Sequence, residues 1–517
     1  MNSTPSRGPT WGLQPFAWGA ALALIGIKLL LHGLTAHNYG YFRDELYFLD
    51  CARHMGWGFV DDAPLTIACF KAALWMGGSL PAVRMIAAAW GAGMIAISML
   101  LARELGGGRF AQGLAGLCVL CAPILLAADS ILCVTTLETV LWTWFAFHLA
   151  RFLRTGDPRQ WLWAGLAAGV GLENKYSTLV VLLALLIALL LSPQRRELIR
   201  PWLWAGAGLA LLVFLPTLLW QAHHHFPVIE DQENVRRMGK NVVLAPWPFL
   251  KQQITFLHPF LFPVWLAGLV SLLRRGETRL LGWLYLAVLG VMMALHAKDY
   301  YVASIYPMLF AAGGVAFERF FDGPGLRLGR LWPKAAVCAV IILVTAPLVP
   351  AILPFLAPEK LAAYQVELGL KPKQLETHHE GALDQRLGDQ IGWPEMAQEV
   401  ARVYQALPPE ERAKTAIYAA NYGEAGAINQ FGPALGLPEA LCAHQAHSLW
   451  GTPAFDGDTI IALGCSRKGL EEEFRSVELA AEHHSDWGMG EENGPIYLCR
   501  GVKTPLKELW PSLKHWD

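Results

Sequence analysis

Two adjacent carboxylates, Asp44 and Glu45, are the residues of this sequence best suited to chemistry. They lie among aromatic residues in the stretch Tyr41–Asp50, a few positions after a long apolar segment. A carboxylate held by aromatic side chains at a membrane interface is partly desolvated, and such a group suits proton abstraction from an incoming hydroxyl. The same oxygens could hold a divalent cation. The alternative is a solvated loop pair, or an ion pair of Glu45 with Arg43 or Arg53.

Further acidic residues lie in the same loop and at the ends of apolar segments. Asp61 and Asp62 form a second acidic pair, which either makes an Asx-type turn or helix cap or lines the wall of the same polar site. Asp129 and Glu138 fall near the ends of two apolar segments, where acids usually face a protein interior or a cavity. They either belong to the site or form a structural pair with Lys175.

Two lone cations lie at the edges of apolar segments, Lys175 and Lys298. Either they extend toward the membrane surface, or they bind an anion. Lys298 is followed closely by Tyr300 and Tyr301, and an ammonium group beside two phenols suits a phosphate.

Basic residues also occur farther along the chain. Arg236 and Arg237 either cover an anionic ligand or form a solvated face. His258 is an isolated candidate site residue, whereas the run His223–His225 is poorly placed to bind a single ion from one element.

The elements that must position these residues are membrane helices. Hydrophobic residues make up 54% of the 517 residues and charged residues only 16%, whereas globular proteins carry about 25% charged residues. The basic residues are scattered, without the dense basic stripe of a nucleic-acid-binding protein. Eleven apolar segments approach the roughly 20 residues that cross a bilayer. They are approximately 15–36, 81–103, 110–128, 134–153, 160–174, 176–192, 201–220, 259–273, 279–296, 301–318 and 334–356. The fifth and sixth segments are either two spans or one bent helix.

The placement of Arg residues predicts the orientation of these spans. Five short loops are rich in Arg, which is typical of cytoplasmic loops, while the alternate loops are longer and mixed in charge. The N-terminus is then cytoplasmic, and the first apolar segment is a retained signal anchor. The loops at about 37–80 and 221–258, with Asp44 in the first, are extracytoplasmic. We expect the first loop to form short helices along the membrane surface.

The tail from about 357 to 517 is charged and has no long apolar run. It follows a membrane domain that we place at 1–356. β-like runs occur at 415–419 and 459–463, and helix-like runs at 394–407 and 469–477, which predicts a small soluble α/β domain. If this domain is extracytoplasmic, two of its three cysteines could pair, namely two of Cys442, Cys465 and Cys499.

Several of these motifs, in this order, resemble one family. They are Tyr41–Tyr47, Trp57–Leu65, Leu137–Trp142, Gly169–Tyr176 and Lys298–Pro307. Together they resemble the GT-C superfamily of glycosyltransferases. The closest resemblance is to the bacterial branch of family 39, the dolichyl-phosphate-mannose protein mannosyltransferase-like proteins, which is related to the lipid A aminoarabinose transferase. The resemblance covers about residues 15–320, and Asn421–Ala427 is similar to extracytoplasmic tails of that branch.

The resemblance implies a GT-C fold and an inverting sugar transfer at the outer face of the bacterial inner (plasma) membrane. The donor would be a sugar on a polyprenyl phosphate, and the acceptor a hydroxyl of a lipid, glycan or protein. By position, Asp44 matches the family's base, with Glu45 as its support. The residues that match the family's phosphate-binding positions are Lys298, Tyr300, Tyr301 and, more weakly, Lys175. No cofactor is required, although a divalent cation bound by Asp44 or Glu45 could assist. Many relatives have a different sequence after Asp61, which leaves the role of Asp62 open.

Two other functions compete with an enzyme. A flippase or transporter of lipid-linked sugars would favour internal repeats, whereas the loops of this chain are unequal and a soluble domain follows the last span. The third hypothesis is a lipid-binding scaffold protein with a vestigial site.

Overall fold

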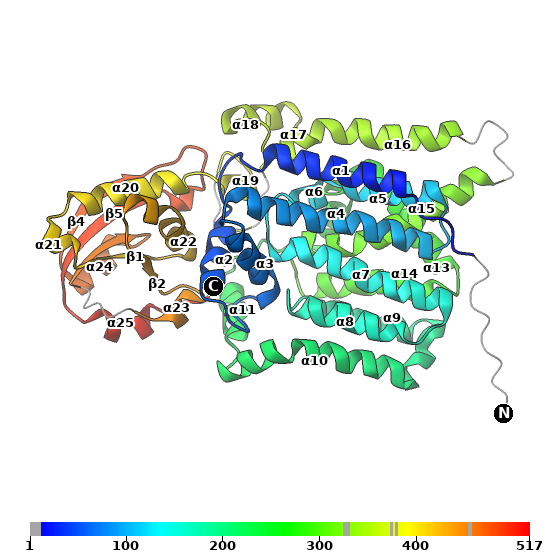
Figure 1. The fold of residues 1–517 in the computed structure, drawn as a ribbon, viewed down its shortest axis with the longest axis horizontal. Coiled ribbons are helices and arrows are strands. Elements are labelled where there is room, and N and C mark those ends of the chain that lie inside the picture. Colours follow the sequence, from blue (N-terminus) through cyan, green and yellow to red (C-terminus); the bar gives the residue numbers. More distant parts are fainter. Residues whose placement is uncertain (1–11, 324–330, 373–375, 378–380, 453–457) are drawn as a thin grey trace. The chain divides into compact units, whose positions relative to one another are not determined.

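The computed structural model describes residues 12–323, 331–372, 376–377, 381–452 and 458–517. These residues are mainly helical, with one small sheet (Figure 1). The chain divides into two compact units. The helical unit comprises Met1–Ala36, Pro81–Leu218 and Val243–Phe355. The α/β unit comprises His37–Leu80, Leu219–Val242 and Leu356–Asp517.

The helical unit contains most of the long helices of the chain. Their bounds are α1 (Trp18–Thr35), α4 (Leu80–Glu104), α5 (Arg109–Cys121), α6 (Pro123–Ala128), α7 (Val134–Thr155), α8 (Gln160–Leu172), α9 (Thr178–Leu190), α10 (Pro201–His223), α12 (Pro246–Thr255), α13 (Phe262–Arg274), α14 (Arg279–Ala294), α15 (Tyr306–Asp322), α16 (Leu331–Thr345) and α17 (Val349–Ile352). Short 3₁₀ helices join some of them, among them η1 (Pro193–Ile199), η2 (Pro259–Leu261), η3 (Asp299–Ile305) and η4 (Ala346–Leu348). All eleven predicted apolar segments contain helix.

Some of the predicted segments are interrupted for identifiable reasons. The third breaks between α5 and α6, where Ala122 is extended and Pro123 begins the next helix. Proline disfavours helical backbone in the residue before it, which explains this break. The fifth and sixth segments are two separate helices, α8 and α9, joined by residues 173–177.

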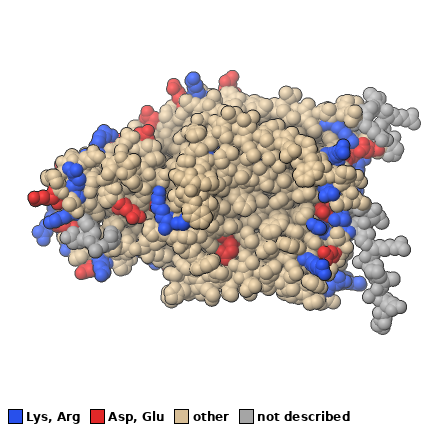
Figure 2. All heavy atoms as spheres, viewed as in Figure 1, with Lys and Arg blue, Asp and Glu red and all other residues tan. Residues whose placement is uncertain are grey.

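The chain is a multi-pass membrane protein, but the number of its spans stays a prediction. Among the described residues, five helices are long and apolar enough to cross a membrane, or up to seven if each of two bent helix pairs is one span. The flank of the helical unit seen in Figure 2 is almost free of charge, and Lys and Arg side chains gather at its right-hand end. This distribution suits a protein surrounded by lipid.

Glycines allow helices of this unit to pack closely. A Cβ on Gly165 of α8 would lie 2.1 Å from the carbonyl oxygen of Gly206 in α10. A Cβ on Gly268 of α13 would lie 2.2 Å from the carbonyl oxygen of Leu309 in α15. Small residues at such crossings are typical of membrane helix pairs, where packing drives association.

The α/β unit is built on a five-stranded sheet. Its strands are β1 (Thr415–Ala419), β2 (Ala440–Cys442), β3 (Thr459–Leu463), β4 (Phe474–His483) and β5 (Gly494–Val502), in the order β2-β1-β3-β5-β4. β1 is parallel to β2 and β3, and β5 is antiparallel to β3 and β4. β3 is buried along its whole length, which explains its unbroken apolar sequence.

Helices complete the α/β unit. They are α2 (Arg43–Arg53), α3 (Pro64–Trp75), α11 (Pro227–Arg237), α18 (Pro358–Glu367), α19 (Gln385–Gly388), α20 (Trp393–Ala406), α21 (Pro409–Arg412), α22 (Tyr422–Phe431), α23 (His447–Trp450), α24 (Arg467–Glu473) and α25 (Leu506–Leu513). The predicted strands at 415–419 and 459–463 are present, as is the helix predicted at 394–407. The helix predicted at 469–477 is wrong after Glu473, because residues 474–477 pair with β5 as part of β4. The first loop forms two short helices, α2 and α3, as expected.

The two compact units divide the chain differently from the predicted domains in one respect. The loop 37–80 and residues 219–242 group with the tail, whereas the sequence assigned both loops to the membrane domain. The division into a membrane domain at 1–356 and a soluble domain at 357–517 stays a prediction. The cysteines of the tail, Cys442, Cys465 and Cys499, are free thiols in this structure.

Candidate active site

Asp44 lies in the first turn of α2, and Glu45 fixes where that helix begins. Phe42, the residue before the helix, is extended, and its N–H donates to Oε2 of Glu45 at 2.9 Å. The Glu45 side chain is fully buried. Carboxylates at a helix N-terminus are stabilised by the free N–H groups and the helix dipole. Glu45 therefore holds the start of the helix, and Asp44 next to it remains partly exposed.

A tyrosine from the tail orients Asp44. The hydroxyl of Tyr422, the first residue of α22, donates to Oδ1 of Asp44 at 3.0 Å. The Tyr422 ring also lies 4.8 Å from the ring of Tyr47, and the Arg43 guanidinium lies 5.6 Å from its centroid. Sequence reasoning singled out the stretch around Tyr422 by resemblance but assigned it no role.

The two arginines beside the acidic pair have other partners. Arg43 forms long ion pairs of 3.6 to 3.9 Å with three glutamates of the tail, namely Glu376, Glu491 and Glu492. Arg53 pairs with Asp50. Both arginines thus form ion pairs with acids other than Glu45.

Asp50 joins the first loop to the tail. This buried carboxylate accepts from Arg53, from Nδ2 of Asn429 at 2.7 Å and from Nε2 of His447 at 3.1 Å. Asn429 lies on α22 and His447 on α23, both in the tail. Asp50 therefore stabilises the packing that holds α2, and with it Asp44, against the tail.

Asp61 lies in the same electrostatic environment as Asp44. Its Oδ1 accepts from the Tyr47 hydroxyl at 2.7 Å. Burial, together with the negative charges of Asp231 and Asp44, raises the pKa of Asp61 to about 7. A carboxyl group that titrates near neutral pH can exchange a proton under physiological conditions. α3 begins at Pro64 without a side-chain cap, so the helix-cap alternative is not observed there, and a place of Asp61 in the wall of a polar site stays a prediction.

Asp231 is an acid that sequence reasoning did not single out. It is buried on α11 and accepts hydrogen bonds at 2.9 Å from Gln232 and from Gln445. Burial raises the pKa of Asp231 above its usual value. No local pattern distinguishes Asp231 from other charged residues of its helix, so the sequence carried no signal for it.

The helical unit brings together a second set of predicted residues. The Lys175 ammonium lies 3.8 Å from the ring centroid of Tyr301 and 3.5 Å from Oε2 of Glu138. Glu138 is buried and also accepts from Ser177 and, at 3.3 Å, from Ser304. Glu138 therefore pairs with Lys175, and whether this pair is purely structural or belongs to the site stays a prediction.

The other predicted phosphate residues flank this group. Lys298 is partly buried and directly precedes η3, in which Tyr300 and Tyr301 lie edge to face with ring centroids 4.9 Å apart. That these residues bind a phosphate stays a prediction.

Asp129 pairs with Lys28 and not with Lys175. Its Oδ2 lies 2.6 Å from the Lys28 ammonium, and neither side chain is exposed. Gly91 leaves room for this pair, because a Cβ there would lie 2.3 Å from Oδ2 of Asp129. Lys28 is a lone lysine within the first apolar segment, and this could have indicated a buried ion pair, but the sequence analysis did not single it out.

The remaining predicted residues show ordinary structural environments. Arg236 and Arg237 are exposed on α11, and Arg237 pairs with Glu233 one turn earlier at 3.1 Å. This arrangement agrees with the solvated-face alternative. His258 is buried in the helical unit, where its Nε2 lies 3.2 Å from the Thr345 hydroxyl. Asp62 is partly buried, and its backbone oxygen accepts from the N–H of Phe59.

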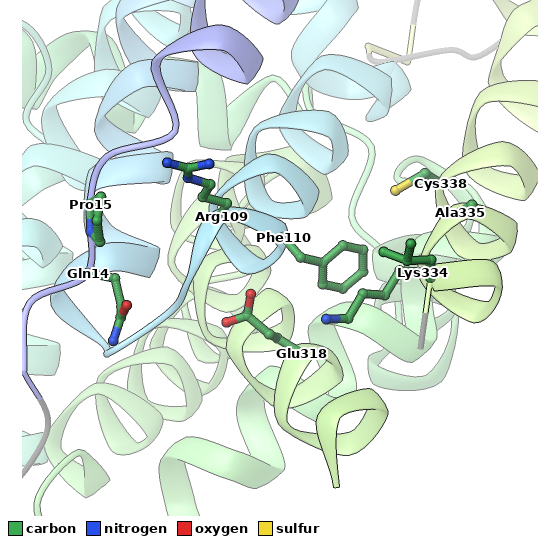
Figure 3. A pocket seen from close by; sticks show the side chains of 9 residues that line it. Gln14, Pro15, Arg109, Phe110, Glu318, Lys334, Ala335 and Cys338 are labelled. Carbon is green, nitrogen blue, oxygen red and sulfur yellow. The ribbon is translucent and has the colours of Figure 1, made fainter. Parts of the chain in front are cut away.

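A cavity of about 780 Å³ lies elsewhere in the helical unit (Figure 3). Its lining includes Arg109 and Phe110 of α5, Glu318 of α15 and Lys334 of α16. Glu318 accepts from the N–H of Gly108 at 2.6 Å and so caps α5. None of the predicted site residues lines this cavity.

Comparisons with known proteins agree with this architecture. Residues 63–220 match the family model of the dolichyl-phosphate-mannose-protein mannosyltransferases. Among curated proteins, none matches the sequence significantly. The crystal structure of ArnT from Cupriavidus metallidurans bound to undecaprenyl phosphate is similar, with a TM-score of 0.60 and 14% identity, covering 93% of this chain and 98% of that one. The apo structure of the same protein has a TM-score of 0.58 and 15% identity over the same shares. The resemblance found in the sequence motifs is therefore confirmed at the level of the fold: this chain has the fold of ArnT, and residues 63–220 match the mannosyltransferase family model.

Proposed function

We propose that this protein transfers a sugar from a polyprenyl-phosphate donor to a hydroxyl of a lipid, glycan or protein, with inversion at the anomeric carbon. The observation that carries the proposal is the geometry of Asp44. It is a partly exposed carboxylate at the start of a helix, with one oxygen held by the Tyr422 hydroxyl at 3.0 Å. The family match and the shared fold support the same reaction class.

Asp44 is the general base of the proposed reaction. It takes the proton of the acceptor hydroxyl as the acceptor oxygen bonds to the anomeric carbon. The bond from that carbon to the phosphate oxygen breaks, and polyprenyl phosphate leaves with the electron pair. The leaving phosphate is stable as an anion, so the transfer requires no metal, although a cation could assist.

The leaving phosphate needs positive charge and hydrogen-bond donors. Preorganised donors stabilise charge that develops in the transition state. The residues proposed to supply this charge and these donors are Lys175, Lys298, Tyr300 and Tyr301. The contact between Lys175 and Tyr301 supports this role. The ArnT structure was determined with undecaprenyl phosphate, which supports a polyprenyl phosphate as the lipid partner here.

The reaction is proposed to take place at the outer face of a bacterial inner membrane. Its support is the Arg-rich character of the five short loops, which favours a cytoplasmic location for them. By the same rule, the loop with Asp44 and the tail are extracytoplasmic.

The test is Asp44→Asn in the full chain, with a radiolabelled polyprenyl-phosphate sugar as donor and an envelope lipid extract as acceptor. Asparagine keeps the shape of the side chain but cannot take the proton, so we expect transfer to fall by about 100-fold or more. Glu230→Gln, an exposed acid on α11, is the matched control. Transfer at the wild-type rate by folded Asp44→Asn protein would refute the role of the base.

Proteoliposomes distinguish the transferase from a flippase. Labelled donor is supplied from one side, with no acceptor present. A transferase leaves the label on that side, whereas movement of intact donor across the bilayer, absent from protein-free liposomes, would overturn the proposal.

A further inference from the structure

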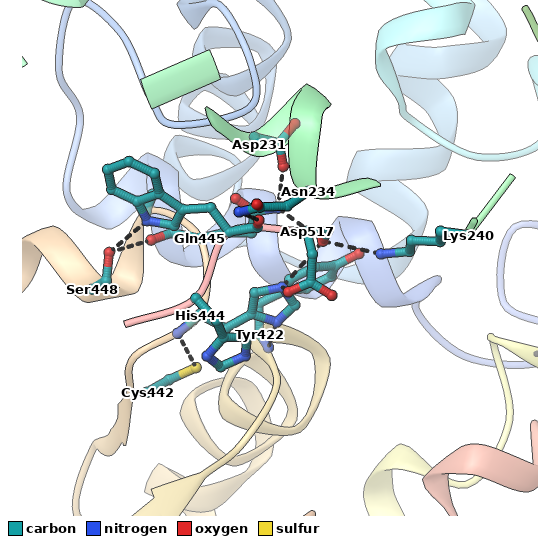
Figure 4. A network of polar contacts seen from close by, with 12 residues as sticks. Asp231, Asn234, Lys240, Tyr422, Cys442, His444, Gln445, Ser448 and Asp517 are labelled. Atoms are coloured by element: carbon teal, nitrogen blue, oxygen red, sulfur yellow. Dashed lines mark hydrogen bonds and ion pairs between the residues drawn. The ribbon is translucent and has the colours of Figure 1, made fainter. Parts of the chain in front are cut away.

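His444 is a buried histidine of the α/β unit to which the proposed reaction assigns no role. It lies just after β2, and its ring centroid is 4.8 Å from that of Tyr422 (Figure 4). Tyr422 is the residue whose hydroxyl donates to Asp44 at 3.0 Å. A single residue, Tyr422, thus separates His444 from the proposed base.

The main-chain N–H of Tyr422 needs a partner from outside its helix. Tyr422 is the first residue of α22, and the first N–H groups of a helix have no acceptor within it. Nδ1 of His444 supplies the acceptor at 3.4 Å. Asn421 and Glu424 satisfy other N–H groups of this helix start through a capping box. His444 therefore adds a contact from a separate element to the start of α22.

The hydrogen bonds assign the proton of the His444 ring. A main-chain N–H can only donate, so Nδ1 of His444 accepts and the ring proton lies on Nε2. Nε2 donates to the backbone oxygen of Asp517 at 3.3 Å. Burial lowers the pKa of His444 well below its usual value, and the neighbouring His515 and Lys240 act in the same direction. The ring is therefore neutral, and Nδ1 keeps its lone pair for the N–H of Tyr422.

The main chain fixes the position of the His444 ring. His444 and His515 form a parallel β-bridge, in which the N–H of His515 donates to the oxygen of Ala443 at 3.2 Å. The two imidazole rings stack with centroids 4.4 Å apart. The N–H of His444 donates to Sγ of Cys442 at 3.4 Å, as drawn in Figure 4. A ring held in this way can set the position of the group that bonds to it.

The position of the start of α22 decides whether the Tyr422 hydroxyl reaches Asp44. α22 packs closely on α2, the helix that carries Asp44, since a Cβ on Gly426 would lie 2.8 Å from the carbonyl carbon of Leu46. A shift of the first turn of α22 would therefore change the distance between the Tyr422 hydroxyl and the Asp44 carboxylate.

We propose that His444 is a positioning residue for the sugar transfer. Its Nδ1 holds the main chain of Tyr422, and the Tyr422 hydroxyl in turn orients the Asp44 carboxylate. The inference rests on the proposed function, because His444 acts through the proposed base. Misplacement of a base lowers the rate of the chemical step. A change at His444 should therefore lower kcat and leave the KM for the donor unchanged, since the residues proposed to hold the donor phosphate belong to the helical unit.

The test compares three variants of His444 in the full chain, with the donor and acceptor extract used for Asp44→Asn. His444→Leu removes both ring nitrogens, and we expect kcat to fall by about 3- to 10-fold, the factor that corresponds to a neutral hydrogen bond. Asparagine places its side-chain oxygen near the position of Nδ1, so His444→Asn should transfer at close to the wild-type rate. Glutamine reaches the position of Nε2 instead, so His444→Gln should behave like His444→Leu.

Two further measurements separate this role from a purely structural one. In the Tyr422→Phe background, His444→Leu should cause little further decrease in kcat, because the hydroxyl through which it acts is gone. Hydrogen exchange of the peptide that begins α22 is measured without substrate. It should be faster in His444→Leu than in the wild type, and close to the wild type in His444→Asn.

His483→Leu is the matched control, because His483 is also a buried histidine of this unit and lies 2.7 Å from Oε2 of Glu399. The inference is overturned if His444→Leu lowers kcat no more than His483→Leu, or if it has the same effect with Tyr422→Phe. Equal transfer by His444→Asn and His444→Gln, or unchanged hydrogen exchange in His444→Leu, would also overturn it. If His444→Leu does not fold, the comparison of His444→Asn with His444→Gln decides.

Failure of the proposed function gives a different result. In that case the wild type transfers no sugar, or Asp44→Asn transfers at the wild-type rate, and either outcome overturns this inference as well. When Asp44→Asn is inactive and the His444 variants match the control, only the role of His444 is refuted.

Discussion

Tyr422→Phe tests whether the tail supports the proposed base. The change removes the hydroxyl that donates to Asp44 at 3.0 Å and keeps the ring beside Tyr47. A hydrogen bond to a charged group contributes about 1.5 to 3 kcal/mol. At about 1.4 kcal/mol per factor of ten, this energy corresponds to about 10- to 150-fold, which is an upper limit for the decrease in kcat/KM, because the bond already exists in the free enzyme and affects the rate only by orienting Asp44. Tyr422 is partly exposed, so water can replace part of the bond, and we expect a decrease of about tenfold.

The assay compares kcat and KM for sugar transfer in the wild type and the variant. Tyr404→Phe is the matched control, because it also removes a phenol hydroxyl from a partly exposed residue of the α/β unit. Thermal unfolding of both variants checks that they are folded.

A double-mutant cycle with Asp44→Asn then separates orientation of the base from a general effect. If Tyr422 acts through Asp44, Tyr422→Phe has little further effect on the residual activity of the Asp44→Asn protein. The reasoning is refuted if Tyr422→Phe lowers kcat/KM no more than Tyr404→Phe, or if its effect is the same in both backgrounds.

Three further predictions concern stability. Gly426→Ala should lower the melting temperature, because the new Cβ would lie 2.8 Å from the carbonyl carbon of Leu46 and force α22 away from α2. The free energy of unfolding of the wild type should fall between pH 5 and pH 8, whereas that of Asp61→Asn should not show this fall. The pKa of Asp61 is about 7 in the folded protein against 3.8 ordinarily, so the wild type loses stability as pH rises through this range. Lys28→Met and Asp129→Asn should each cost about 3 to 5 kcal/mol, because each leaves a buried polar partner without its ion pair.

Each of these predictions has a clear contrary result. Gly208, which has nothing within 4 Å of an added Cβ, is the control for Gly426, and equal melting temperatures for the two alanine variants would contradict the packing argument. A constant difference between Asp61→Asn and the wild type at both pH values would contradict the raised pKa. Single variants of Lys28 or Asp129 as stable as the wild type would show that the ion pair contributes nothing.

The sequence determined the features that depend on local pattern. The apolar segments are helices because their length and composition permit little else in a membrane. The strands at 415–419 and 459–463 were also visible, since short apolar runs rich in Ile, Thr and Ala between helix patterns favour a buried sheet. Asp44 and Glu45 were singled out because two carboxylates among aromatic residues beside a membrane span are rare.

Only the tertiary structure decided which side chains act together. Tyr422 lies 378 positions after Asp44, and nothing in the local sequence of either residue indicates the hydrogen bond between them. The pair of Lys28 and Asp129 likewise joins two separate helices. Periodicity and composition report which face of an element is buried, but not which element covers it. That choice is made by the packing of whole segments, and it decided that the two neighbouring acids differ, with Glu45 capping the helix and Asp44 held by the tail.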